Sequence, residues 1–255
     1  MLEARHLVRR FYGTAVVDDV SFVLRPGEVT GYLGPNGSGK TTTVRMLTGL
    51  IEPTSGSVTF RGQRISDNLT DYRRRLGYVP EEPFLYPFMS GREYLELVGR
   101  LRELPESLLS RKIPAMLILF GMGDAGEQSI GSYSKGMKQK VLICAALMHD
   151  PDVIVFDEPE SGLDVGAVLV LRHLVQTLAA RGKAILYSSH ILESVEKVCA
   201  NVIVLHRGRV VADASVEHLR SEMARSSLEE VFSELVLRDD PARTASDIAD
   251  VVSIR

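Results

Sequence analysis

The sequence predicts an α/β fold with a mainly parallel sheet, because short apolar runs alternate with helix-compatible stretches. Four of these runs are rich in β-branched residues, which is typical of strands buried on both faces. They lie at residues 29–33, 153–156, 184–187 and 202–205. Three runs nearer the N-terminus, with turns such as Arg25-Pro26-Gly27, predict a small antiparallel layer beside the parallel core. They lie at residues 2–8, 16–22 and 58–61.

Helices are expected between the strands of the core. The candidate helical stretches are residues 40–50, 91–104, 134–149, 165–180 and 191–198. Residues 83–148 are rich in Leu, Met and other helix formers, so we expect an inserted α-helical subdomain over about residues 84–150. Within it, Pro114 should begin or interrupt a helix, because proline cannot donate a backbone hydrogen bond.

The pattern becomes helical again from Ser215 onward. Ser227 and Glu230 have the Ser-x-x-Glu spacing of a capping box, and Asp239-Asp240-Pro241 should end the helix that follows. We therefore expect a large domain over residues 1–214 and a C-terminal helical extension over residues 215–255.

Composition excludes several classes of protein. The 30 Lys and Arg residues stand against 33 Asp and Glu residues, and this net charge of −3 argues against a nucleic-acid partner. The two cysteines, Cys144 and Cys199, lie in separate apolar stretches and cannot form a disulfide framework. No apolar run approaches the roughly 18 residues that span a bilayer, and the N-terminus lacks the apolar core of a signal peptide. We therefore expect a soluble, cytoplasmic protein.

A glycine-rich stretch lies between the expected strand at 29–33 and the expected helix at 40–50. It consists of Gly34, Pro35, Asn36, Gly37, Ser38, Gly39, Lys40, Thr41 and Thr42, with the phosphate-loop spacing G-x-x-x-x-G-K-[ST]. Glycines let backbone N–H groups turn towards phosphates, and a helix N-terminus adds positive potential. Lys40 can bridge terminal phosphates, and the Thr41 hydroxyl can ligate Mg²⁺. The stretch predicts a P-loop NTPase core; the alternative is a glycine-rich turn without a ligand.

Two carboxylates follow the expected strand at 153–156. Such a strand places Asp157 and Glu158 at the carboxyl edge of the sheet, beside the phosphate loop. Asp157 is expected to hold Mg²⁺, and Glu158 is expected to orient or deprotonate the attacking water. An acidic pair after a strand can also be a solvated loop start, but the phosphate loop upstream favours the catalytic interpretation.

These motifs and four further segments resemble the ATP-binding cassette (ABC) family, in the family's order, over roughly residues 1–215. Tyr12 lies where the family has an aromatic residue stacked on adenine. Tyr133-Ser134-Lys135-Gly136-Met137 is similar to the signature loop, which implies that Ser134 and Gly136 bind nucleotide. Ser161-Gly162-Leu163-Asp164 looks like the loop at the dimer interface, and His190 resembles the catalytic switch histidine.

Taken alone, these segments allow simpler interpretations. Ser134 can bind an anion at a helix start or act only as an N-cap. Gly136 in a first helical turn suggests the close approach of a ligand. His190 can hydrogen-bond a phosphate or water, or be an ordinary loop histidine. Tyr12 can stack on a base or pack at a strand edge.

Departures from the family pattern narrow the resemblance to one subfamily. Lys135 replaces the first glycine of the signature loop, Glu81 stands where the family usually has glutamine, and Val165 stands where proline is usual. With the segment 228–232, these features resemble the ATPase subunits of ABC-2 type bacterial exporters. The resemblance makes Glu81 a candidate metal-binding residue, because a carboxylate can approach Mg²⁺ directly or through water.

The resemblance implies an ATPase that uses ATP and Mg²⁺ and powers export through a separate multi-span membrane permease. It also implies a homodimer with ATP held head to tail between two chains, peripheral on the inner face of the cell membrane. One alternative is a soluble ABC-type ATPase of translation or repair. Another is a nucleotide-binding regulatory module without turnover, against which the presence of Glu158 argues.

A short apolar segment follows Glu81. It contains Phe84, Leu85, Tyr86, Phe88 and Met89, and the prolines at 80, 83 and 87 restrict its backbone. We expect part of this segment to be the surface that docks on the permease. Local packing into the core is the open alternative.

Overall fold

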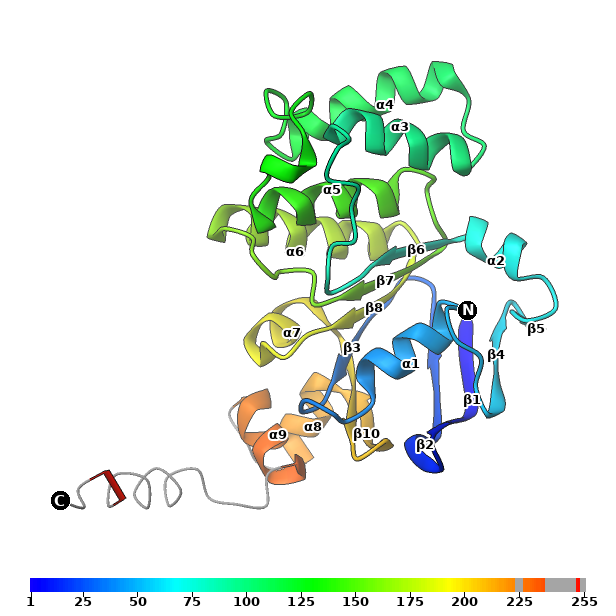
Figure 1. Ribbon diagram of the computed structural model, residues 1–255. Coiled ribbons are helices and arrows are strands. Elements are labelled where there is room, and N and C mark those ends of the chain that lie inside the picture. Colours follow the sequence, from blue (N-terminus) through cyan, green and yellow to red (C-terminus); the bar gives the residue numbers. More distant parts are fainter. Residues whose placement is uncertain (223–226, 237–250, 253–255) are drawn as a thin grey trace.

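The structure, a computed structural model, describes residues 1–222, 227–236 and 251–252, which form two sheets and a set of helices around them (Figure 1). The smaller sheet is antiparallel, has the order β2-β1-β4-β5, and confirms the predicted N-terminal layer. Its strands are β1 (Leu2–Phe11), β2 (Thr14–Leu24), β4 (Ser55–Phe60) and β5 (Gln63–Arg64).

The larger sheet has the order β10-β9-β3-β8-β7-β6 and is parallel except for the pairing of β10 with β9. Its strands are β3 (Val29–Leu33), β6 (Leu76–Val79), β7 (Val153–Asp157), β8 (Ala184–Ser188), β9 (Asn201–His206) and β10 (Arg209–Ser215). Every residue of β3, β7 and β8 is buried, as their apolar runs predict.

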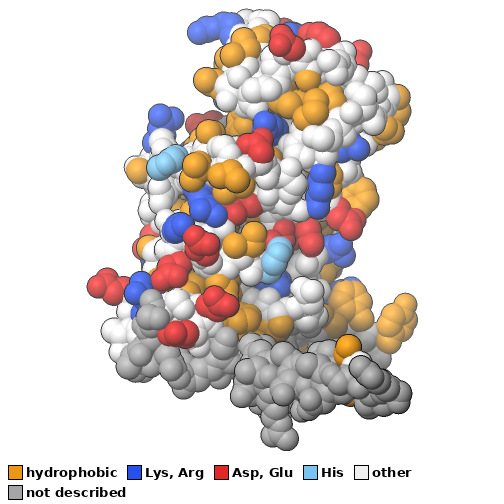
Figure 2. All heavy atoms as spheres, turned by 90° about the vertical axis from the view of Figure 1, so that its left-hand side faces the viewer, with side chains coloured by type: hydrophobic (Ala, Val, Ile, Leu, Met, Phe, Trp, Pro, Cys, Tyr) orange, Lys and Arg blue, Asp and Glu red, His pale blue; other side chains and the backbone are white. Residues whose placement is uncertain are grey.

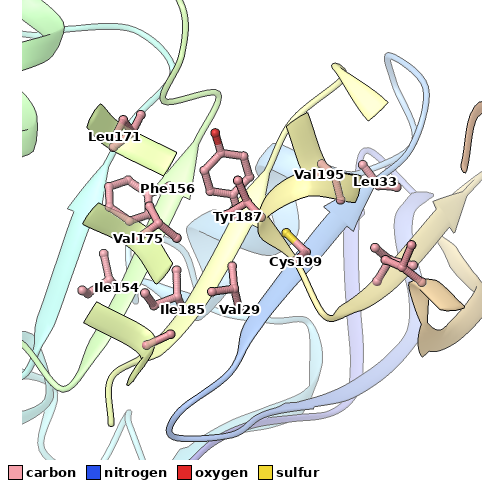
Figure 3. Packing of buried hydrophobic residues seen from close by; sticks show 14 of the residues in the cluster. Val29, Leu33, Ile154, Phe156, Leu171, Val175, Ile185, Tyr187, Val195 and Cys199 are labelled. Carbon is pink, nitrogen blue, oxygen red and sulfur yellow. The ribbon is translucent and has the colours of Figure 1, made fainter. Parts of the chain in front are cut away.

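Side chains of the larger sheet alternate between two apolar clusters. Ile154 and Phe156 of β7 point into one cluster, whereas Val153 and Val155 point into the other. The first cluster also contains residues of α5 (Lys135–Leu147), α6 (Val165–Ala180) and α7 (Leu192–Val198). Figure 3 shows it, with the rings of Phe156 and Tyr187 side by side and 6.2 Å between their centroids. The second cluster packs the smaller sheet and α1 (Lys40–Leu47) against the larger one.

Three α-helices lie between β6 and β7 in the sequence, as predicted for the helical insertion. They are α3 (Gly91–Leu101), α4 (Glu106–Leu119) and α5, with a short 3₁₀ helix, η1 (Ile130–Ser132), before α5. The prediction for Pro114 is wrong, because Pro114 lies inside α4. Leu109, Ile113 and Leu117 are buried at four-residue spacing in the core of this subdomain, and their packing stabilises α4 despite the hydrogen bond that proline cannot make.

Some short helices and strands were not predicted from the sequence. The strand β6 was not predicted, and among the described strands it pairs only with β7, at the edge of the larger sheet. The helix α2 (Leu69–Arg74) and the edge strand β10 were also missed. Each of these elements is short and carries charged residues or glycine, so its apolar pattern is weak.

The C-terminal extension contains α8 (Val216–Glu222) and α9 (Leu228–Val236). The backbone N–H of Glu230 donates to Ser227 Oγ at 3.3 Å, which confirms the cap at the start of α9. Leu228 and Val231 are buried in the same cluster as α7. The expected helix end at residues 239–241 lies outside the described residues, and the domain boundary at 214/215 remains a prediction. Within the described part of the chain, no helix has the length and apolar character to cross a membrane.

Gly77 gives a test of the packing between β6 and α5. A Cβ atom on Gly77 would lie 2.5 Å from the backbone oxygen of Ala146 and 2.9 Å from Pro151 Cγ. We expect Gly77→Ala to lower the free energy of unfolding by about 1–3 kcal/mol, because backbone atoms would have to shift. Gly123→Ala is the control, since its Cβ would meet Ile118 at ordinary contact distances, 3.4 Å to Cγ1 and 3.9 Å to Cα. Urea unfolding of both variants measures the difference, and equal midpoints would contradict this account.

Candidate functional site

A pocket of about 500 Å³ opens beside the carboxyl ends of β3, β7 and β8. It contains most of the residues that the sequence predicts to bind nucleotide or act in catalysis. These are Gly34, Pro35, Asn36, Gly37, Gly39, Lys40, Thr41, Thr42, Glu81, Asp157, Glu158 and His190.

The phosphate loop leads from β3 into α1, and its glycines are required by its geometry. Gly39 is the N-cap of α1 with φ of 104°, a conformation that side chains disfavour. At Gly34, a Cβ atom would lie 2.4 Å from the backbone oxygen of Leu205 and 2.5 Å from Ser38 Oγ. The Ser38 side chain is buried, so within this loop it packs inwards instead of lining the pocket.

Lys40 contributes a positively charged side chain to the wall of the pocket. Its ammonium Nζ donates to the backbone oxygens of Gly34 at 2.6 Å and Pro35 at 3.2 Å, so the side chain lies across the loop. Burial lowers the pKa of Lys40, against the opposing effect of the nearby Glu158, Asp157 and Glu81 carboxylates. A half-buried ammonium beside a helix N-terminus is suited to an anionic ligand.

Asp157, the last residue of β7, is nearly fully buried, and its Oδ2 has no hydrogen-bond partner among the described residues. Burial raises the pKa of Asp157 to about 6, and the negative charges of Glu81 and Glu158 add to the rise. An unpaired buried carboxylate at the edge of a pocket is suited to a cation. The described residues contain no cluster of three or more His, Cys, Asp or Glu side chains that could hold a metal without further ligands.

Glu158 and His190 meet at the mouth of the pocket. Glu158 Oε2 lies 2.7 Å from His190 Nδ1, and the backbone N–H of Glu158 donates to the oxygen of Ser188 at 3.0 Å. Glu158 has a positive φ of 50°, which is uncommon for a residue other than glycine and typical of functional sites. A carboxylate held by an imidazole beside a phosphate loop can accept a proton from water.

Besides Ser38, three predicted residues do not line this pocket. Tyr12 is fully exposed in the turn between β1 and β2, so packing at a strand edge does not account for it. Ser134 is exposed and caps α5, with its Oγ 3.2 Å from the backbone nitrogen of Met137. A Cβ atom on Gly136 would lie 2.4 Å from the backbone oxygen of Gly162, so a neighbouring loop of the same chain already requires this glycine.

Several lining residues were not predicted from the sequence: Val16, Ser189, Leu192 and Phe232. Val16 belongs to β2, and Phe232 to α9 at the other end of the chain. Only the fold brings them to the phosphate loop, because no local pattern distinguishes them from ordinary packing residues. Ser189 has a weak signal in its position next to His190.

The apolar segment after Glu81 is divided between the surface and the interior. Phe84, Tyr86 and Phe88 are exposed, with 80%, 52% and 79% of their surfaces accessible. Leu85 and Met89 are half-buried. Core packing therefore does not account for the three aromatic residues.

Comparisons with known proteins agree with this geometry. The family described as ABC transporter matches residues 17–161. The chain is 39% identical to the "ABC transporter ATP-binding protein NatA" of Bacillus subtilis (strain 168), over 87% of this chain and 91% of that protein. It is 33% identical to the "Nod factor export ATP-binding protein I" of Cupriavidus pinatubonensis, over 92% of this chain and 72% of that protein. A solved "Structure of ATP binding subunit of ABC transporter" superposes with a TM-score of 0.87 at 36% identity, over 92% of this chain and 99% of that one.

The raised pKa of Asp157 predicts a stability effect that depends on pH. Folding disfavours the charged Asp157 carboxylate, and this lowers the free energy of unfolding when the carboxylate is charged. The loss of stability is absent below pH 3.8, the ordinary pKa of the group, and complete above about pH 6. At pH 8 we expect Asp157→Asn to raise the free energy of unfolding of the nucleotide-free protein by about 1–3 kcal/mol, since one pKa unit corresponds to about 1.4 kcal/mol. Thermal or urea unfolding between about pH 4 and 8 measures this change, because Asp157 titrates within that range.

Asp164→Asn is the matched control for that experiment. The hydrogen bond from the backbone N–H of Ala167 lowers the pKa of Asp164, so this variant should gain no stability at pH 8. A gain for Asp157→Asn that did not change with pH would contradict the assigned cause.

Proposed function

The chain belongs to the ABC transporter family as an ATP-binding subunit whose ATPase activity is coupled to transport, and we propose that it powers export through a separate ABC-2 type permease. The single observation that carries the mechanism is the pocket in which the phosphate loop, Asp157 and the Glu158–His190 pair meet. The export direction is supported by the similarity to a protein named for Nod factor export.

In the proposed mechanism, backbone N–H groups of residues 36–41 and the Lys40 ammonium bind the phosphates of ATP. Lys40 exchanges its contacts with the Gly34 and Pro35 oxygens for phosphate oxygens. Glu158 orients the attacking water and accepts its proton. His190 holds the Glu158 carboxylate in place and is close enough to the pocket to contact the terminal phosphate.

The residues of the pocket also fit Mg²⁺. Thr41 and Asp157 would hold the ion, and Glu81 is the further candidate, because all three line the pocket and Asp157 keeps an unpaired buried oxygen. Mg²⁺ in proteins is held by one or two carboxylates together with substrate phosphates. Its contribution would be to neutralise the charge of the phosphates.

The active unit is proposed to be a homodimer with ATP between the chains. Ser134 and Gly136 do not line their own chain's pocket, although Ser134 is exposed at the N-terminus of α5. In the head-to-tail arrangement they would bind the nucleotide of the second chain, and Tyr12 would stack on adenine. The loop 161–164, against which Gly136 packs, would lie at the interface.

The partner in the membrane is proposed to dock on the exposed aromatic residues Phe84, Tyr86 and Phe88. Contiguous exposed aromatic side chains are typical of interaction sites, and these follow directly after Glu81 of the pocket. This contact would place the chain on the inner face of the cell membrane.

Two rival functions are less well supported. Acidic and basic side chains are interspersed on the face shown in Figure 2, and the net charge is −3, so neither observation favours a nucleic-acid partner in translation or repair. The Glu158–His190 contact favours turnover over a nucleotide-binding module without hydrolysis.

Glu158→Gln separates binding from hydrolysis. The amide keeps the shape of the side chain but cannot accept the proton, so we expect hydrolysis to fall about 100-fold or more. ATP binding should survive, and the variant should accumulate as an ATP-bound dimer in size-exclusion chromatography. Lys40→Ala is the comparison and should lose ATP binding itself. Wild-type phosphate release by Glu158→Gln would contradict the catalytic role, and a strictly monomeric profile would count against the dimer.

Docking is tested with Phe84→Asp and Phe88→Asp. Both side chains are exposed, so the variants should fold and hydrolyse ATP as the isolated wild-type chain does. We expect each to lose most co-purification with the permease, because a buried charge disrupts an apolar contact. Leu101→Asp is the control, since Leu101 is 74% exposed at the end of α3 and should have no effect. Undiminished complex formation by both phenylalanine variants would refute the docking surface.

A further inference from the structure

A second carboxylate lies two residues beyond Glu158, buried and fully paired. Glu160 accepts hydrogen bonds from Arg172 Nε at 2.9 Å, from Ser194 Oγ at 2.7 Å and from Tyr187 Oη at 2.8 Å. Arg172 Nη2 also lies 3.3 Å from the second Glu160 oxygen and donates to Ser194 Oγ at 2.7 Å. We call Glu160, Arg172, Tyr187 and Ser194 the Glu160 cluster.

The Glu160 cluster joins four segments of the fold. Glu160 lies in the loop after β7, Arg172 in α6, Tyr187 in β8 and Ser194 in α7. Figure 3 shows the Tyr187 ring packed beside Phe156, with its hydroxyl pointing away from the apolar side chains of Ile185 and Val29. The hydroxyl therefore reaches Glu160 from inside the core.

The charge of Glu160 is compensated within the protein. Burial acts to raise the pKa of Glu160, but the hydrogen bonds from Arg172, Ser194 and Tyr187 outweigh it, so the pKa is lowered. Burial and the Glu160 charge raise the pKa of Tyr187, which keeps its hydroxyl a donor. A buried carboxylate with this many partners holds its neighbours in one arrangement, because losing a partner leaves a buried charge uncompensated.

The residues of the Glu160 cluster flank Glu158 and His190 along the chain. Glu160 is two residues after Glu158, while Tyr187 and Ser194 stand three residues before and four residues after His190. The loop that carries His190 is thus bonded to the same carboxylate at both of its ends. The positive φ of Glu158 needs support of this kind, because strained conformations persist only where the surroundings enforce them.

We propose that Glu160 and Arg172, acting through Tyr187 and Ser194, are positioning residues that fix the geometry between Glu158 and His190. This inference rests on the proposed catalytic role of that pair. The phosphate loop takes no part in the cluster, since the Lys40 contacts are with Gly34 and Pro35. The cluster therefore controls the rate of hydrolysis and leaves nucleotide affinity unchanged.

The test uses Tyr187→Phe and Ser194→Ala, each of which removes one hydroxyl and should still fold. We expect kcat for ATP hydrolysis to fall about tenfold in each, since small misplacement of catalytic groups has effects of this order. The Kd for ATP should stay within about twofold of wild type, a smaller change than the loss of a contact with the nucleotide would cause. In a Glu158→Gln background, Tyr187→Phe should cause no further loss of residual hydrolysis, because effects of residues acting as a unit are not additive.

Tyr72→Phe is the matched control. Tyr72 lies on α2, and its buried hydroxyl donates to the backbone oxygen of Leu47 on α1 at 2.8 Å, in a core cluster that excludes the catalytic pair. This variant should therefore lose comparable stability and keep wild-type kcat. Wild-type kcat in both Tyr187→Phe and Ser194→Ala, or an equal loss of kcat in Tyr72→Phe, would overturn the inference. An inactive wild-type chain would instead count against the proposed function.

Discussion

The parallel pairing of β8 with both β3 and β7 is the constraint on which the rest of the site depends. Because these strands run in the same direction, their carboxyl ends meet at one edge, and three separate loops begin there. The loop after β3 has the phosphate-loop sequence, β7 ends in Asp157 and is followed by Glu158, and the loop after β8 carries His190. The antiparallel sheet and the helices α5, α6 and α7 cover the two faces and keep this edge fixed.

Two buried carboxylates near that edge differ in their hydrogen bonding. Asp157 keeps an oxygen without a protein partner and has a raised pKa, so its negative charge is held at a cost that a bound cation would offset. Glu160 has all its partners within the protein and a lowered pKa, so it stabilises one arrangement of the surrounding loops. This difference in hydrogen bonding distinguishes the carboxylate proposed to bind a cation from the one proposed to position the loops, although only three positions separate Asp157 at the end of β7 from Glu160.

The sequence predicted the α/β fold and most of the pocket, because the phosphate loop, the acidic pair and His190 each carry their signal within a few consecutive residues. What it missed depends on contacts between distant segments. Phe232 and Val16 reach the pocket only through the fold, and the Glu160 cluster joins residues from four elements. Pro114 was misjudged because tertiary packing of Ile113 and Leu117 outweighs a local preference. The nucleotide contact predicted for Gly136 stays a prediction, while the close approach that the structure shows there comes from Gly162.

The central claim is that this pocket binds ATP through the phosphate loop and Asp157. A crystal structure of the chain with a non-hydrolysable ATP analogue and Mg²⁺ tests it most directly. The account predicts phosphates against the backbone N–H groups of residues 36–41, with Lys40 released from Gly34 and Pro35 and the cation beside Thr41 and Asp157. An analogue bound elsewhere, with Lys40 still bonded to those backbone oxygens, would contradict it.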